Sequence, residues 1–128
     1  MPELVLDNGS GLSRRERISA GSLVNLLLAA DASNIREEYA SSLAVAATDG
    51  TVQKRFQSGS VGGQALLKTG TLEGVRAIAG YVIDRDGRRF ALAALVNHPS
   101  AAHPQAALDF LVQWVYQNAA GWEPPPDR

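Results

Sequence analysis

Three extended apolar runs, separated by turn residues, lie in the second half of the sequence and constrain the fold most. They cover residues 65–72, 74–84 and 88–97, and the tetrapeptide Asp84-Arg85-Asp86-Gly87 between the last two is typical of a hairpin turn. In residues 75–83 both alternating sets of side chains are largely apolar, so this strand needs cover on both faces. The pattern therefore predicts an antiparallel meander of three strands with helices packed against it.

Helical patterns precede and follow these strands. A first helix should begin after Ser19, a suitable N-cap, and a second, shorter one after Asn34, which forms a capping-box pattern with Glu37. Pro104 suits the first position of a last helix, and Gly121 should end it. Apolar residues with helical spacing support the first helix: Leu23, Leu26, Leu27 and Ala30. We expect an α+β fold with two N-terminal helices, a three-stranded antiparallel sheet segment and a C-terminal helix.

Composition excludes several classes of protein. Twelve basic and thirteen acidic residues leave a net charge of −1, which provides no cationic surface for nucleic acid or an anionic membrane. The absence of cysteine and the presence of only two histidines leave no ligand set for structural zinc, and no metal or organic cofactor is implied. No apolar run approaches the roughly 20 residues that span a bilayer, and the start has no signal-peptide pattern. We expect one globular unit over residues 1–121, with residues 122–128 as a flexible proline-rich tail.

The segment Lys68-Thr69-Gly70-Thr71 is the best candidate for a functional site. A lysine supplies a charge for a substrate carboxylate, a threonine hydroxyl adds a directional donor, and a glycine lets another backbone approach closely. An extended peptide could add alongside such a strand. Alternation points Lys68 and Gly70 one way and both threonines the other, so they can serve one ligand only at a sheet edge. Taken alone, the tripeptide K-T-G favours the simpler interpretation of a strand with one solvated lysine.

The order of sequence blocks along the chain adds a family resemblance. The blocks NGSGLSRRERIS, LAVAATDGT, RF, KTGTL, AGYV and DGRRFALAALVN resemble the C-terminal part of the class C low-molecular-mass penicillin-binding proteins. These are D-alanyl-D-alanine carboxypeptidase/endopeptidases of the serine β-lactamase/transpeptidase-like superfamily, in which K-T-G stands beside S-x-x-K and S-D-N. The resemblance implies that Lys68 polarises the site and attracts the substrate carboxylate, which Thr69 binds. It also implies that Gly70 gives the substrate room and that the Thr71 N–H forms half of an oxyanion hole.

The other two motifs of that family are absent. Thr51 and Ala65 stand three residues before the only lysines, Lys54 and Lys68, so there is no S-x-x-K, and no serine is followed two residues later by asparagine. In the family both motifs lie upstream, so we expect this chain to be the C-terminal portion of a longer enzyme and inactive alone. The resemblance implies a stem peptide ending in D-Ala-D-Ala as substrate, β-lactams as inhibitors and the missing N-terminal part as partner. It also implies a periplasmic or other extracytoplasmic location.

Two alternatives remain open. A Ser/His/Asp triad could combine Ser10 or Ser13 with His98 or His103 and Asp7, although no strand–turn–helix elbow surrounds either serine, and a structural role for their loop at the rim of the cleft is favoured. The chain could also be a non-catalytic peptide-binding module or a structural association module. The nearby arginines are interpreted as a solvated face: Arg14, Arg15 and Arg17.

Overall fold

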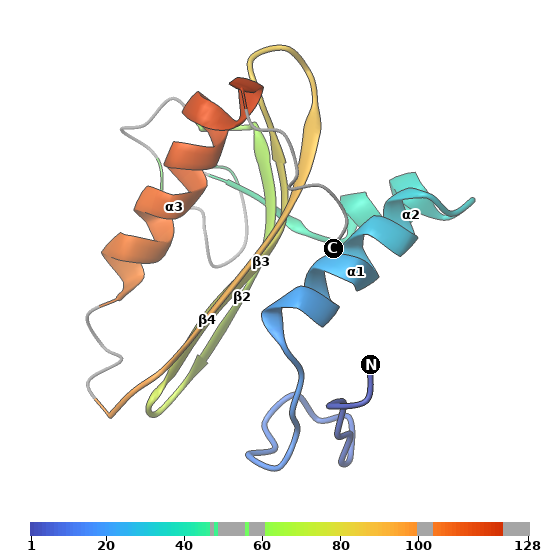
Figure 1. The fold of residues 1–128 in the computed structure, drawn as a ribbon, viewed down its shortest axis with the longest axis vertical. Coiled ribbons are helices and arrows are strands. Elements are labelled where there is room, and N and C mark those ends of the chain that lie inside the picture. Colours follow the sequence, from blue (N-terminus) through green and yellow to red (C-terminus); the bar gives the residue numbers. More distant parts are fainter. Residues whose placement is uncertain (47, 49–55, 57–60, 100–103, 122–128) are drawn as a thin grey trace.

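The computed structural model describes residues 1–46, 48, 56, 61–99 and 104–121, and in this part of the chain helices cover both faces of one antiparallel sheet (Figure 1). The helix α3 lies on one face, and α1 and α2 lie on the other. The predicted α+β fold is confirmed. The elements in chain order are α1 (Ala20–Asp31), α2 (Arg36–Ser41), β1 (Ala44–Val45), β2 (Ala65–Leu72), β3 (Val75–Ile83), β4 (Arg89–Asn97), α3 (Gln105–Asn118) and the 3-10 turn η2 (Ala119–Gly121).

The sheet has four strands rather than the three expected. Its order is β1-β2-β3-β4, and each neighbouring pair is antiparallel. The additional strand β1 is two residues long and pairs only with Leu66 and Leu67 of β2. Two residues are too few to show the alternation by which strands are recognised in a sequence. The other three strands begin and end within one residue of the predicted ranges.

Apolar clusters on both sides of the sheet hold the helices in place. The cluster under α3 contains the fully buried residues Leu67, Ile78, Val82 and Val112. On the opposite face Leu27 and Ala40 pack against Tyr81, whose hydroxyl donates a 2.5 Å hydrogen bond to the Leu27 carbonyl. Burial raises the pKa of the Tyr81 phenol, and the negative charge of Asp31 adds to this effect. The middle strand is therefore covered on both faces, as its two apolar sets required.

Gly80 allows β2 and β3 to approach each other closely. Its φ is +151°, and a Cβ atom at this position would lie 2.0 Å from the Leu66 carbonyl oxygen. Only glycine fits such a position without moving a backbone. This contact lies two residues before Lys68 and fixes the place of β2 against the middle of the sheet.

The predicted hairpin between β3 and β4 is present and is organised by one carboxylate. Asp84 is 3% exposed and accepts hydrogen bonds from the backbone N–H groups of Asp86 and Arg88, at 2.9 and 2.8 Å, and from Arg88 Nε at 2.8 Å. Burial raises the pKa of this carboxyl, but the hydrogen bonds from Arg88 and Asp86 outweigh it, so the pKa lies below its ordinary value. Gly87, with φ +78°, completes the turn.

The helix ends agree only in part with the sequence-based expectations. Ser19 is the N-cap of α1, as predicted, and its side chain accepts a hydrogen bond from the Ser22 N–H at 3.1 Å. The capping box at Asn34 is wrong, because Ile35 occupies the N-cap position of α2 and no side chain caps this helix. Pro104 is the N-cap of α3 rather than its first residue. The expected tail at residues 122–128 and His103 lie outside the described residues.

Candidate active-site strand

The segment Lys68–Thr71 lies in the second half of β2, with its side chains on alternate faces of the sheet. Lys68 and Thr71 are exposed, and Thr69 and Gly70 are half-buried. Lys68 follows Leu66 on the face that packs against α1 and α2, whereas Thr69 and Thr71 follow Leu67 on the face of α3. The side chains therefore diverge, as the alternation predicted, and any shared ligand has to lie at an edge.

This part of β2 forms an edge of the described sheet. The short strand β1 pairs with Leu66 and Leu67, and no strand among the described residues continues beyond that point on the same side. On its other side β2 pairs with β3 along its whole length, from Ala65 to Leu72. Within the part of the chain that the structure describes, residues Lys68–Leu72 therefore form a sheet edge, the position at which a shared ligand was expected.

Hydrogen bonds around the start of β2 show which backbone groups face this edge. The Ala46 N–H donates to the Ala65 carbonyl at 2.9 Å on the side of β1, and the Ile83 N–H donates to the Gln64 carbonyl at 2.7 Å on the side of β3. Backbone groups of successive strand residues point alternately to the two sides. Positions 67, 69 and 71 therefore face the same side as Ala65, and the Thr71 N–H points out of the edge.

The Lys68 ammonium reaches the same edge from the opposite face of the sheet. Its Nζ donates a 2.5 Å hydrogen bond to the Thr69 carbonyl, which faces the edge by the same alternation. The cation and the Thr71 N–H therefore converge although their side chains point to different faces. A Cβ at Gly70 would lie 3.3 Å from the Ala77 Cβ, so a side chain there would crowd the neighbouring strand. The chemistry of this edge suits an anionic group and an extended backbone.

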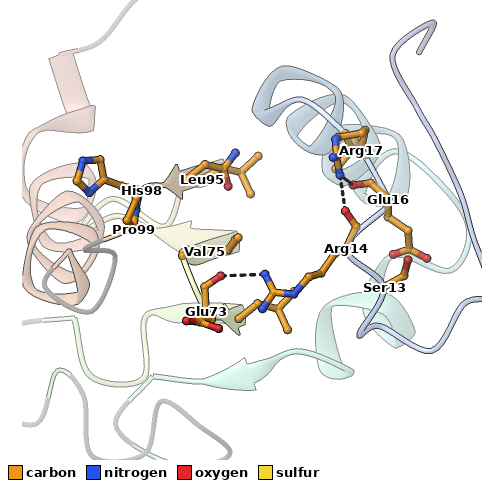
Figure 2. A pocket seen from close by; sticks show the side chains of 13 residues that line it. Ser13, Arg14, Glu16, Arg17, Glu73, Val75, Leu95, His98 and Pro99 are labelled. Carbon is orange, nitrogen blue, oxygen red and sulfur yellow. Dashed lines mark hydrogen bonds between the residues drawn. The ribbon is translucent and has the colours of Figure 1, made fainter.

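A cavity of about 630 Å³ begins one residue beyond Thr71 (Figure 2). It lies between the segment 13–18, the turn 72–75 and the end of β4 with the residues that follow it. Arg14 crosses this space and donates a 3.1 Å hydrogen bond to the Glu73 carbonyl. Arg17 also lines the cavity, and its guanidinium donates to the carbonyls of Arg14 and Glu16 at 2.7 and 2.8 Å.

Sequence reasoning missed this cavity, because it treated the arginines as a solvated face. Arg14 is indeed exposed, but it contacts a turn 59 residues further along the chain. A cluster of basic residues beside a glycine-rich loop was the only signal available, and this signal does not distinguish a cavity wall from a solvated loop.

The described residues do not assemble the alternative Ser/His/Asp triad. Ser13 Oγ donates directly to Asp7 Oδ2 at 2.6 Å, so no imidazole lies between these two groups. His98 and Ser13 both line the cavity but stand on opposite sides of it in Figure 2. Ser10 Oγ accepts a hydrogen bond from the Leu12 N–H at 3.2 Å, which is a turn contact. Of the loop 7–13, Ser13 alone lines the cavity.

The described residues contain no group of three or more histidine, cysteine, aspartate or glutamate side chains placed to hold a metal ion. None of their helices is both long enough and apolar enough to cross a membrane.

Known proteins resemble this chain in sequence. The chain is 35% identical over 111 residues to a D-alanyl-D-alanine carboxypeptidase of Actinomadura sp. (strain R39), which covers 83% of this chain and 20% of that protein. It is 33% identical over 78 residues to a penicillin-sensitive carboxypeptidase A of Dictyostelium discoideum, which covers 59% of this chain and 15% of that protein. The chain thus spans about a fifth or less of the length of these relatives.

Solved structures show the same fold. Penicillin binding protein 4 from Haemophilus influenzae matches 93% of this chain and 28% of its own chain with a TM-score of 0.76 and 23% identity. A structure of the same protein in complex with a β-lactam matches 94% of this chain and 29% of its own chain, with a TM-score of 0.76 and 24% identity. The model of the D-Ala-D-Ala carboxypeptidase 3 (S13) family matches residues 1–118, and this chain belongs to that family.

Proposed function

We propose that this chain forms the K-T-G wall of the active site in a serine D-alanyl-D-alanine carboxypeptidase/endopeptidase that acts on peptidoglycan peptides. The observation that carries the proposal is the convergence of the Lys68 ammonium and the Thr71 N–H on one open edge of β2. A cation and an outward N–H are the two groups that a hydrolase needs to bind a terminal carboxylate and to stabilise a developing oxyanion.

Each residue of the motif then has a distinct task. The substrate lies along the edge as an added strand, with its terminal carboxylate at Lys68 and the Thr69 hydroxyl. Gly70 keeps the strand free of a side chain where the substrate backbone passes. The Thr71 N–H donates to the oxygen of the scissile carbonyl, and the second donor is the N–H of the nucleophile.

This order gives the bound peptide a direction. The carboxylate end lies near Lys68 and the scissile bond near Thr71, so the acyl part continues past Leu72 towards the cavity. The cavity is lined by charges of both signs, among them Arg14 and Glu16, and it suits a polar side chain of the stem peptide.

The reaction is acyl transfer through a serine that lies on polypeptide outside this chain. The serine attacks the amide between the two D-alanines, D-alanine leaves with a proton, and water hydrolyses the acyl-enzyme. The sequence contains no S-x-x-K, so the chain alone supplies binding and half of the oxyanion hole but no attacking group. The whole enzyme would work outside the cytoplasmic membrane, where its peptidoglycan substrate lies, and β-lactams would inhibit it as mimics of the acyl donor.

A titration with a tripeptide ending in D-Ala-D-Ala tests the binding role of the isolated chain. We expect NMR shift changes concentrated at residues 68–72, and we expect Lys68→Ala to abolish them. Arg85→Ala, which removes an exposed cation at the β3–β4 hairpin, is the matched control and should leave the changes intact. The same peptide with a C-terminal amide should bind more weakly, because it lacks the carboxylate. Shift changes confined to other elements would contradict the proposal.

A non-catalytic peptide-binding module is the second candidate, favoured by the missing S-x-x-K. Both candidates predict binding by the isolated chain and no labelled band after incubation with a fluorescent penicillin and denaturing electrophoresis. They differ for the longer polypeptide, which should label only if it is a serine enzyme. A labelled band from the isolated chain would contradict both candidates, because it would require a nucleophile within these 128 residues.

A further inference from the structure

Asn8 is the only asparagine of the sequence that is followed by glycine. The backbone nitrogen of the residue after an asparagine can attack the side-chain amide, so the size of that residue matters. Glycine has no Cβ to hinder the attack, and its backbone reaches conformations that are closed to other residues. Larger residues follow the other asparagines: Leu26 after Asn25, Ile35 after Asn34, His98 after Asn97 and Ala119 after Asn118. Asn8 therefore has the least steric protection against such an attack.

The structure leaves Asn8 and Gly9 open to solvent. Both residues are exposed, and a Cβ added at Gly9 would meet no atom within 4 Å. Asn8 Oδ1 accepts a hydrogen bond from the Ser10 N–H at 3.0 Å, and this donor stabilises the negative charge that the oxygen gains during an attack. Within the part of the chain that the structure describes, neither Asn8 Nδ2 nor the Gly9 N–H makes a hydrogen bond. The leaving group and the attacking nitrogen are therefore both accessible.

We propose that Asn8 is a modification site at which the folded chain loses ammonia. The Gly9 nitrogen gives its proton to a base in the solvent and forms a bond to Asn8 Cγ, which closes a succinimide ring. The bond between Cγ and Nδ2 breaks, and Nδ2 leaves as ammonia with a proton from the solvent. Water then opens the ring at either carbonyl and gives aspartate or isoaspartate. Water is the only co-reactant, and the reaction does not depend on the proposed function.

The two products should affect the loop 7–13 differently. Aspartate keeps the length of the backbone, and its carboxylate still accepts a hydrogen bond from the Ser10 N–H. Isoaspartate routes the backbone through the side-chain methylene, so the chain lengthens by one atom and the acceptor leaves its place. A 2.6 Å hydrogen bond from Ser13 Oγ to Asp7 Oδ2 joins the ends of the loop. Because Asp7 directly precedes Asn8 and Ser13 lines the cavity, isoaspartate should disturb both this hydrogen bond and the cavity wall at Ser13.

Peptide mapping by mass spectrometry tests the proposal on the wild-type chain. After incubation at mildly alkaline pH, the peptide that contains Asn8 should gain about 1 Da, because a hydroxyl group replaces an amino group. The rate of this gain should rise with pH, since the attacking nitrogen has to lose a proton. Asn34 is the internal control. It is also exposed, but the β-branched Ile35 follows it and should make its reaction slower than that of Asn8.

A synthetic peptide of residues 5–12 separates the effect of the sequence from the effect of the fold. We expect Asn8 to react in the folded chain at a rate within about tenfold of its rate in the peptide, because the loop leaves both reacting groups accessible. A slower reaction than this in the folded chain would show that the turn protects Asn8, and it would overturn the proposal. A reaction at Asn34 as fast as that at Asn8 in the folded chain would also overturn it.

Two variants of Asn8 complete the test. Asn8→Gln lengthens the side chain, so the ring that forms would be larger, and this variant should show no mass gain at position 8 over the same incubation. Asn8→Asp reproduces the aspartate product and should leave the NMR shifts of the Ser10 and Ser13 amides close to those of the wild type. The isoaspartate form, separated from the incubated chain by chromatography, should shift both amides. Equal shifts in the two forms would refute the predicted difference between the products.

Discussion

Replacement of Gly80 by alanine should be among the most damaging single changes that the sheet can receive. The added Cβ would lie 2.0 Å from the Leu66 carbonyl oxygen and 3.0 Å from the Leu66 carbonyl carbon. Non-bonded carbon and oxygen atoms stay more than about 3 Å apart, so β2 would have to move by about 1 Å from β3. Overpacking of this kind costs about 1–3 kcal/mol, and an unfavourable φ adds about 1 kcal/mol. We expect Gly80→Ala to lower the free energy of unfolding by about 3 kcal/mol.

Urea denaturation followed by circular dichroism measures this change, and Gly87→Ala is the matched control. Gly87 also has a positive φ, +78°, but an added Cβ there meets no atom within 4 Å. The control therefore contains the backbone cost without the collision and should lose only about 1 kcal/mol. Equal losses in the two variants would refute the argument from close approach. The displacement of β2 should also weaken binding of the D-Ala-D-Ala peptide, because Leu66 lies two residues before Lys68.

Three further predictions concern single groups. Tyr81→Phe leaves the buried Leu27 carbonyl without its 2.5 Å donor and should cost about 1–2 kcal/mol of unfolding free energy, measured by urea denaturation. Glu3 accepts hydrogen bonds from the Ser22 and Ser19 side chains, with Ser22 the larger cause, and its pKa falls from 4.5 to about 2. Because the pKa of Glu3 is depressed in the folded state, the stabilisation by its carboxylate is complete above about pH 4.5 and is lost as the pH falls towards 2. Urea unfolding curves across this range should show a smaller loss of unfolding free energy in Glu3→Gln than in the wild type. Thr71→Pro removes the outward N–H of the proposed oxyanion hole and should slow penicillin acylation of the longer polypeptide by about 10²–10³-fold, while an unchanged rate would exclude this N–H.

The three long strands could be predicted because each is an extended, largely apolar run of eight or nine residues bounded by turn residues. The strand β1 could not, since its two residues form a strand only through pairing with Leu66 and Leu67. The capping box at Asn34 failed for a related reason: the local pattern was suitable, but the chain enters α2 one residue later at Ile35. Local sequence patterns predict long helices and strands well. They fail for short strands and helix ends whose position depends on tertiary contacts.

The candidate site shows the same division between local and tertiary information. The residue types at Lys68–Thr71 were visible in the sequence, and so was the alternation that separates their side chains. Their convergence depends on where β1 stops and on which backbone groups face outward, and both are properties of the assembled sheet. The cavity beside the motif depends on a contact between Arg14 and Glu73, which no local pattern could indicate.

The two edges of the described sheet, formed by β2 and β4, differ in the polarity of their residues. An open edge is an aggregation hazard unless it is polar, and the β2 edge carries an exposed lysine and an exposed threonine. The β4 edge has no charged residue or proline between Phe90 and Val96 and so lacks this protection. The polar groups that protect the β2 edge are also those proposed to bind the substrate. The loss of Lys68 should therefore lower the solubility of the chain as well as weaken ligand binding.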